Sequence, residues 1–372
     1  MALALTRTTS LLTHQCKAGR IMHLTTAQLS PPMSVRVKCV LPAMGYDRED
    51  DLTGFHTGSE FEYDGVTFIH KSDCRDYDWL VVYDDMPRHD VGSIRKEVEP
   101  LACPPEQTIL VTAEPPTIKL YPDCYTRQFG YVLTTHDPLY LPHRNYRRGQ
   151  GCLRWISGYE KRSSVFNMPE WPKSKLISTV CSDKQMKHTQ HFNRYRLTKH
   201  IADNLPELEW FGWGKQPLSR KYHGLIDFKY HLAAENYVHP YHWSDKISDP
   251  ILALCLTFYA GDPALAEILP EESFIPIPID NPEAALEIIT KAIRDNEYEK
   301  RLPAIREARR LIVTKYNLFS QVAEVIRSHG SPTPQEPGTG CIRGRHTLRR
   351  NPIHALEELF MLTRFRLLQR IR

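Results

Sequence analysis

The sequence predicts an α/β protein with two successive domains. Its 372 residues exceed the size at which a single hydrophobic core keeps growing, so two domains of about 150 residues each are expected. Short runs of β-branched and aromatic residues alternate with helical patterns in both halves of the chain. Because these runs are continuously apolar rather than alternating, we expect parallel strands that helices cover on both faces.

The first predicted domain covers residues 34–165. Five short runs rich in β-branched and aromatic residues, each bounded by turn formers, predict its strands. These runs are residues 35–42, 66–70, 78–84, 108–113 and 131–136. A proline-punctuated link at 165–175 then separates this domain from the next.

The second predicted domain covers residues 171–329. Its strand-like runs are residues 175–182, 209–214, 228–236, 255–261 and 273–279. Helical patterns occur at 193–205 and 282–313. Two α/β units joined by a short link predict a cleft between them, with ligands bound at the carboxyl ends of the strands.

The two ends of the chain differ from the body in charge. Residues 341–372 hold eight arginines and two glutamates, and residues 1–33 hold three basic residues and no acid, so the remaining chain is net negative. This distribution argues against a nucleic-acid-binding surface on the body. We expect residues 1–33 to be a disordered extension, although their lack of acids also resembles a targeting segment. Residues 330–372 are expected to form a flexible linker and a basic amphipathic tail.

The tail is expected to form a helix over residues 351–372. The apolar residues near one of its faces are Ile353, Leu356, Phe360, Leu367 and Ile371. Arg364 interrupts this stripe. Such a helix can lie on an anionic membrane surface, or it can pack on its own domain or on a partner, and the pattern leaves both open.

Composition and cysteine spacing are typical of an ordinary globular protein in a reducing compartment. Apolar residues make up 41% of the chain and charged residues 25%, and no stretch approaches the ~18 apolar residues of a spanning helix. The nine cysteines are scattered and never arranged as CxxC, which argues against a disulfide scaffold and against a structural zinc site. We therefore expect a cytoplasmic protein, or one that is peripheral at a membrane.

The stretch HLAAENYVHPYHWSDKI concentrates polar chemistry at the end of a predicted strand. Glu235 and Asn236 follow the strand, and Ser244 can cap a helix that begins beside Asp245 and Lys246. Unsatisfied N–H groups at a helix start and a nearby ammonium both favour a phosphate, and an amide and a carboxylate can hold ribose or sugar hydroxyls. A polar loop with a capped helix explains the same composition.

In its spacing this stretch resembles the signature of the α1,3-fucosyltransferase family, glycosyltransferase family 10, which runs roughly F-E-N-S-x-x-x-x-Y-x-T-E-K. The residues on its E, N, T, E and K are Glu235, Asn236, Ser244, Asp245 and Lys246. The stretches 178–201 and 258–277 also resemble motifs of that family.

The resemblance implies a GT-B-like fold, in which two Rossmann-like domains face each other across a cleft. The first domain would bind the acceptor and the second the nucleotide sugar. The implied reaction is an inverting transfer of fucose or a related sugar, from GDP-fucose or a similar donor, to a glycan hydroxyl. The resemblance implies no metal or other cofactor for this chemistry.

The resemblance also implies roles for the donor-binding residues. Arg194 and Lys246 would contact the donor diphosphate, whose charge grows as the glycosidic bond breaks. Glu235 would contact the donor sugar, while Asn236 and Asp245 would hold hydroxyls.

Four further residues are secondary candidates for donor binding, namely Arg196, Tyr237, His242 and Ser244. Arg196 lies about 200° around its helix from Arg194, so only one of the two arginines can comfortably face the cleft, and we favour Arg194.

Glu114 directly follows the predicted strand 108–113 and resembles the family glutamate that acts as the general base. Direct displacement at an anomeric carbon requires a nearby carboxylate to take the proton of the attacking hydroxyl. Other first-domain glutamates lie in proline-flanked loops or precede a strand. A glutamate at the end of a strand can also be only a helix cap.

We expect no metal site. Asp76 and Asp78 form a DxD pattern, but they precede their strand instead of following it. Pairs of nearby histidines lack a carboxylate or cysteine at the usual spacing to complete a site.

The chain departs from the family signature at four positions, Ala234, Tyr237, His242 and Asp245. These changes alter the shape of the pocket for ribose and sugar. A non-catalytic, membrane-associated relative that binds a glycan or a nucleotide sugar is the alternative.

Overall fold

The computed structural model describes most of the chain. The described residues are 35–40, 60–86, 89–91, 94–149, 168–187, 189–330 and 340–371. The expected extension over residues 1–33 and residues 331–339 of the expected linker lie outside these ranges.

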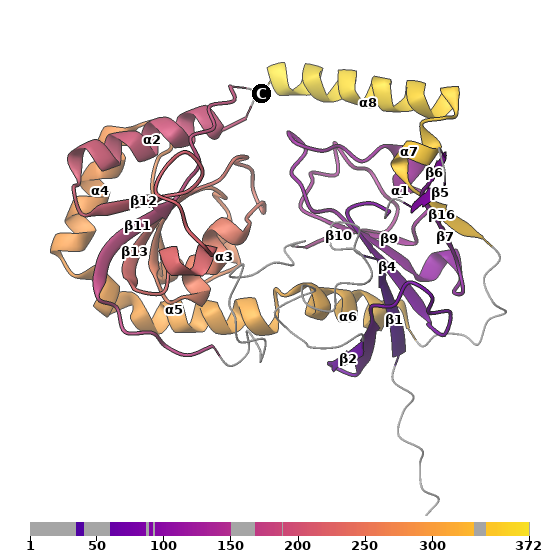
Figure 1. Ribbon diagram of the computed structural model, residues 1–372, viewed down its shortest axis with the longest axis horizontal. Coiled ribbons are helices and arrows are strands. Elements are labelled where there is room, and N and C mark those ends of the chain that lie inside the picture. Colours follow the sequence, from indigo (N-terminus) through magenta and orange to yellow (C-terminus); the bar gives the residue numbers. More distant parts are fainter. Residues whose placement is uncertain are drawn as a thin grey trace, which may run out of the picture. The chain divides into compact units, whose positions relative to one another are not determined.

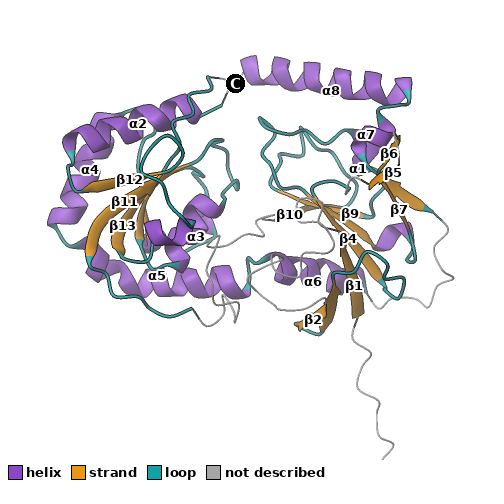
Figure 2. Ribbon diagram, in the orientation of Figure 1, coloured by secondary structure: helices purple, strands orange, loops and turns teal. Residues whose placement is uncertain are grey.

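The first half of the chain forms a seven-stranded sheet. Its strands are β1 (Val35–Val40), β2 (Glu60–Tyr63), β3 (Val66–Ile69), β4 (Trp79–Tyr83), β8 (Thr108–Val111), β9 (Tyr131–Thr134) and β10 (Tyr146–Arg148). Their order is β10-β9-β8-β4-β1-β3-β2, and every pair is parallel except β2 with β3. Figures 1 and 2 show this sheet with β1, β2, β4, β9 and β10 labelled. Strands β2 and β10 were not predicted, because their residues, EFEY and YRR, are not apolar runs.

The second half forms a five-stranded sheet in which all neighbours are parallel. Its strands are β11 (Lys175–Val180), β12 (Leu208–Phe211), β13 (Phe228–Ala234), β14 (Leu256–Ala260) and β15 (Phe274–Pro276). Their order is β12-β11-β13-β14-β15, which is a doubly wound order. The predicted α/β class with two Rossmann-like sheets is confirmed.

Helices cover both faces of the second sheet. They are α2 (His191–Asn204), α3 (Asp245–Leu252), α4 (Pro282–Arg294) and α5 (Glu297–Thr314). Helix α2 contacts α4, and α3 contacts α5 (Figure 1). The single helical stretch predicted over 282–313 is two helices, because Asn296 between them takes a left-handed conformation with φ of 52°.

The C-terminal part of the chain returns to the first half. Helix α6 (Leu318–His329) lies in the range expected for the second domain, yet the Phe319 ring packs against those of Phe61 and Phe68, 4.7 and 4.8 Å away between centroids. Strand β16 (Cys341–Arg343), in the range expected for the linker and tail, pairs antiparallel with β7 (Val98–Pro100). Sequence periodicity carries no information about which sheet such a segment joins.

The remaining elements are short, apart from the last helix. They are β5 (His89–Val91), β6 (Ile94–Lys96), α1 (Asp123–Thr126), α7 (Arg345–Leu348) and α8 (Pro352–Ile371). Strands β5 and β6 form an antiparallel pair, and α1 contacts both α7 and α8.

Helix α8 contacts α1 of the first half. The Phe365 ring contacts Tyr140 at 5.0 Å between centroids. The large apolar side chains that remain exposed on it are Ile353, Leu356, Leu359, Phe360 and Leu367. Within the described residues, no helix combines the length and apolar character that crossing a membrane requires.

Candidate functional site

The strand order of the second sheet reverses between β11 and β13, its adjacent strands. In parallel α/β sheets, ligands bind outside the carboxyl ends of the strands at such a reversal. Helix α2 begins at His191 after the loop that follows β11, and Glu235 is the first residue after β13. The Gln190 N–H donates to the Asn236 carbonyl at 3.1 Å, which joins the two segments.

Glu235 is fully buried and binds the loop that follows it. Its Oε1 accepts hydrogen bonds from the Ser244 N–H (3.0 Å), the Ser244 hydroxyl (2.8 Å) and the Tyr259 hydroxyl (3.3 Å). Its Oε2 lies 3.3 Å from Lys246 Nζ. The family resemblance implies that Glu235 contacts the donor sugar, whereas the structure leaves its carboxylate no exposed surface and gives it several donors within the protein.

Lys246 is held at the start of α3 by two neighbours. Ser244 caps this helix by accepting the Lys246 N–H at 3.3 Å, and its hydroxyl also accepts from Lys246 Nζ at 3.1 Å. Burial lowers the pKa of Lys246, but the carboxylates of Glu235 and Asp245 outweigh burial and raise the pKa above its usual value. The ammonium therefore stays charged at neutral pH.

Arg194 provides a second positive charge beside Lys246. Its side chain is buried in α2, its Nε has no hydrogen-bond partner, and no carboxylate of the described residues pairs with its guanidinium. Its charge acts on Lys246 to lower the pKa of that ammonium, which places the two cations close together. A buried cation without a partner costs free energy that an anionic ligand would recover.

Arg196 points elsewhere. Its side chain is exposed, and its guanidinium donates to the Asp280 carbonyl at 2.9 Å. Of the two candidate arginines on α2, only Arg194 lies beside Lys246.

Asp245 is paired with Lys221, which no motif in the sequence marks as a site residue. Lys221 Nζ lies 2.6 Å from Asp245 Oδ2 and 2.7 Å from Asp249 Oδ2. Burial raises the pKa of Asp245, but Lys221 and Lys246 outweigh burial and hold that pKa well below its usual range. The Asp245 carboxylate is therefore ionised. If it also held ligand hydroxyls, it would bind them and Lys221 at the same time.

Tyr237 and His242 belong to a cluster of rings beside this loop. The Tyr237 ring stacks on His239, 5.6 Å between centroids, and meets His242 edge-on at 5.2 Å. The His242 Nδ1 lies 3.0 Å from the Thr135 hydroxyl, and burial lowers the pKa of His242 to about 4, so this ring is neutral at pH 7. The Asn236 side-chain amide has no hydrogen-bond partner among the described residues and can bind a ligand.

Glu114 lies beyond the end of β8 and is exposed. Desolvation and the Asp84 carboxylate raise its pKa, while Lys246 and Lys119 lower it. The carboxylate thus lies within electrostatic reach of Lys246 although the two are far apart in sequence. Asp84 has a left-handed backbone, with φ of 70°, and accepts hydrogen bonds from Lys119 Nζ (2.8 Å) and the Tyr121 hydroxyl.

The DxD pattern is engaged in structural contacts. Asp78 Oδ2 accepts the Arg36 N–H at 2.8 Å, and Asp76 lies 3.1 Å from Arg36 Nε. In the part of the chain that the structure describes, no three histidine, cysteine or acidic side chains gather in a way that could hold a metal ion.

Comparisons with known proteins find similarity in structure alone. No protein-family model and no curated protein matches the sequence. A solved α1,3-fucosyltransferase with GDP-fucose is 13% identical, with a TM-score of 0.48 over 84% of this chain and 95% of that chain. An α1,3-fucosyltransferase with GDP is 15% identical, with a TM-score of 0.44 over 74% and 83%. A glycosyltransferase from Rickettsia africae is 9% identical, with a TM-score of 0.40 over 68% and 76%.

The chain is thus similar to solved structures of α1,3-fucosyltransferases, the family that its sequence resembles.

Proposed function

We propose that the protein is a glycosyltransferase that moves fucose or a related sugar from a GDP-sugar to a glycan hydroxyl. The observation that carries this proposal is the buried Arg194 guanidinium, which lacks a carboxylate partner and lies close to Lys246 at the switch point of the second sheet. Two adjacent cations at this place are suited to a diphosphate, since each phosphate group brings negative charge. The resemblance of the surrounding sequence to a fucosyltransferase signature supports the choice of sugar.

The proposed reaction is a single displacement with inversion. An acceptor oxygen forms a bond to the anomeric carbon while the bond from that carbon to the diphosphate oxygen breaks. The hydroxyl proton passes to the Glu114 carboxylate, and the electron pair leaves with GDP. A carboxylate whose pKa is raised, as that of Glu114 is, is a stronger base than an ordinary glutamate.

The remaining loop residues would shape the donor site. Glu235 would position Ser244 and Lys246 through its buried hydrogen bonds. Asn236 would offer its amide to a hydroxyl, and His242 would form part of the wall. In this proposal Arg194 and Lys246 neutralise the negative charge that develops on the leaving diphosphate. Transfer is therefore expected to continue in the presence of EDTA.

The proposal is tested by incubating the full-length protein with GDP-fucose and a panel of N-acetylglucosamine and glucose acceptors. We expect GDP release in the presence of an acceptor, with and without EDTA. Glu114→Gln should lower the rate by at least about 100-fold and keep donor binding, because it removes the base and leaves the cations in place. Glu106→Gln, an exposed glutamate of the same half, is the matched control and should be fully active.

Two outcomes would contradict the proposal in different ways. Full activity of Glu114→Gln would show that another group takes the proton. Tight binding of GDP-fucose with no release of GDP for any acceptor would favour the alternative, a non-catalytic protein that binds nucleotide sugars.

We also propose that α8 contacts an anionic membrane surface. Ile353, Leu356 and Phe360 remain exposed on the helix, and Arg364 and Arg366 are exposed on the same helix. Apolar side chains combined with arginines on one helix favour insertion at a charged lipid interface.

A further inference from the structure

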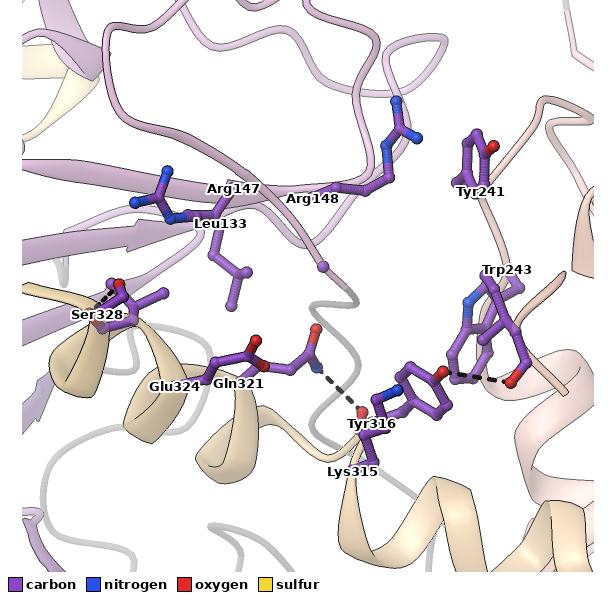
Figure 3. A pocket seen from close by; sticks show the side chains of 13 residues that line it. Leu133, Arg147, Arg148, Tyr241, Trp243, Lys315, Tyr316, Gln321, Glu324 and Ser328 are labelled. Carbon is purple, nitrogen blue, oxygen red and sulfur yellow. Dashed lines mark hydrogen bonds between the residues drawn. The ribbon is translucent and has the colours of Figure 1, made fainter.

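A pocket lies beside the loop that follows β13. Its volume is about 300 Å³, at the lower end of the range for small-molecule sites. Figure 3 shows the side chains that line it. It is lined by Arg147 and Arg148 at β10, by Tyr241 and Trp243 in the loop after β13, and by residues at and after the end of α5. None of the proposed catalytic and diphosphate-binding residues lines it.

Three aromatic side chains form part of the wall, as Figure 3 shows for Tyr241, Trp243 and Tyr316. Trp243 and Tyr316 meet edge to face, 6.0 Å between centroids. The indole N–H of Trp243 has no hydrogen-bond acceptor within the described ranges. This wall therefore offers both ring surfaces and a hydrogen-bond donor to a ligand.

Tyr241 is held in a strained conformation at this wall. Its φ of 66° is rare for a bulky residue, and such strain persists only where the surrounding structure imposes it. The Tyr241 N–H donates to Asp262 Oδ1 at 2.8 Å, and its hydroxyl donates to Glu267 Oε2 at 2.9 Å. These two bonds fix the direction of the ring.

The pocket carries an excess of positive charge. Arg147, Arg148 and Lys315 line it together with one acid, Glu324. None of these four side chains forms an ion pair among the described residues, and the Arg148 guanidinium lies over the Tyr241 ring, 3.9 Å from its centroid. Arg147 donates to the Tyr146 carbonyl at 3.2 Å and lies over the Tyr131 ring, and Figure 3 shows its guanidinium pointing away from that of Arg148. Arg148, beside the aromatic wall, is therefore the arginine available to a ligand carboxylate, whose geometry matches a guanidinium.

We propose that this pocket binds a sugar ring that carries a carboxylate, as part of the glycan acceptor. The C–H face of a sugar ring is electropositive and packs on the negative face of an aromatic ring, while the Arg148 guanidinium binds the acid group and Arg147 adds positive charge nearby. The acceptor role rests on the proposed glycosyl transfer. The binding itself does not, and this allows the two to be tested separately.

The experiment measures binding of cellobiuronic acid and of cellobiose to the full-length protein by titration calorimetry. The two disaccharides differ in a carboxylate that replaces one hydroxymethyl group. We expect the acidic disaccharide to bind at least about tenfold more tightly, which is the scale of one charge-assisted hydrogen bond. The double variant Arg147→Gln and Arg148→Gln should lose this preference, while Arg310→Gln, an arginine on the surface of α5, should keep it.

Three results would overturn the inference. They are equal affinity for the two disaccharides, a preference that survives in the double variant, and displacement of the acidic disaccharide by GDP, which would make this pocket the nucleotide site. If GDP release proceeds with neutral acceptors and neither disaccharide binds, the pocket assignment fails and the glycosyl transfer stands. If the acidic disaccharide binds with the expected preference and GDP is never released, the glycan site stands and the transfer proposal fails.

Discussion

Replacing Glu235 by glutamine separates two roles for this residue. As a contact to the donor sugar, it would affect affinity for the donor and leave the ligand-free protein equally stable. As the group that holds the loop after β13, it should affect stability without any ligand, because its carboxylate binds Ser244, Tyr259 and Lys246. The structure favours the second role.

The expected magnitude follows from the burial of the pair. Breaking a buried ion pair costs about 3 to 5 kcal/mol, because the remaining charge lacks compensation. Glu235 is fully buried, but 26% of the Lys246 side chain is exposed, so water can compensate part of that charge. Glutamine also keeps one oxygen for Ser244. We therefore expect the free energy of unfolding to fall by about 2 to 3 kcal/mol.

The assay is urea unfolding followed by circular dichroism at pH 7, without nucleotide. The matched control is Glu299→Gln, which breaks the ion pair of 2.5 Å between Glu299 and Lys229. The Glu299 side chain is 49% exposed and the Lys229 side chain 35%. Exposed pairs contribute little, so the control should lose less than about 1 kcal/mol. In a Lys246→Met background, Glu235→Gln should cost about 1 to 2 kcal/mol less than in the native chain.

A different pattern would refute this reasoning. If Glu235→Gln left the unfolding free energy of the ligand-free protein unchanged and weakened donor binding, the carboxylate would contact the sugar, as the family resemblance implies. An equal cost with and without Lys246 would show that the ion pair does not stabilise the loop.

Arg194→Gln should weaken GDP binding about 10- to 100-fold in calorimetric titrations, because it removes a charged contact to phosphate. Arg196→Gln should bind GDP as the native protein does, and equal affinity of the two variants would contradict the assignment of Arg194. Burial lowers the pKa of His242 to about 4, so below pH 6.5 the unfolded chain binds more protons than the folded one. The contribution of His242 to the free energy of unfolding should therefore fall by about 1.4 kcal/mol per pH unit as the pH is lowered from 6.5 towards 4. Over the same pH range, the urea midpoint of His242→Gln should drop less steeply than that of the native protein. Replacing Leu356 and Phe360 by serine should reduce co-sedimentation with phosphatidylserine-containing vesicles at least about tenfold, and unchanged sedimentation would argue against membrane contact.

Several features of the fold and the site could be predicted from short stretches of sequence. Continuous apolar runs predicted five of the seven strands of the first sheet and all five of the second, since a strand covered on both faces needs apolar residues at successive positions. The start of α3 followed from Ser244, whose hydroxyl can accept a backbone N–H only a few residues away. The 200° separation of Arg194 and Arg196 followed from helix geometry alone. Each of these depends on interactions between near neighbours in the chain.

Other features depend on contacts between distant parts of the chain, which local patterns do not encode. The Lys221 ammonium meets Asp245 only once the second sheet has formed, and nothing around Lys221 in sequence marks it as a partner. The burial of Glu235 depends on Tyr259 from the neighbouring strand, so the sequence identified the residue and the tertiary structure decided what its carboxylate contacts. In the same way, only packing against Phe61 and Phe68 decided which sheet α6 joins, because an amphipathic helix can cover any apolar surface of matching shape.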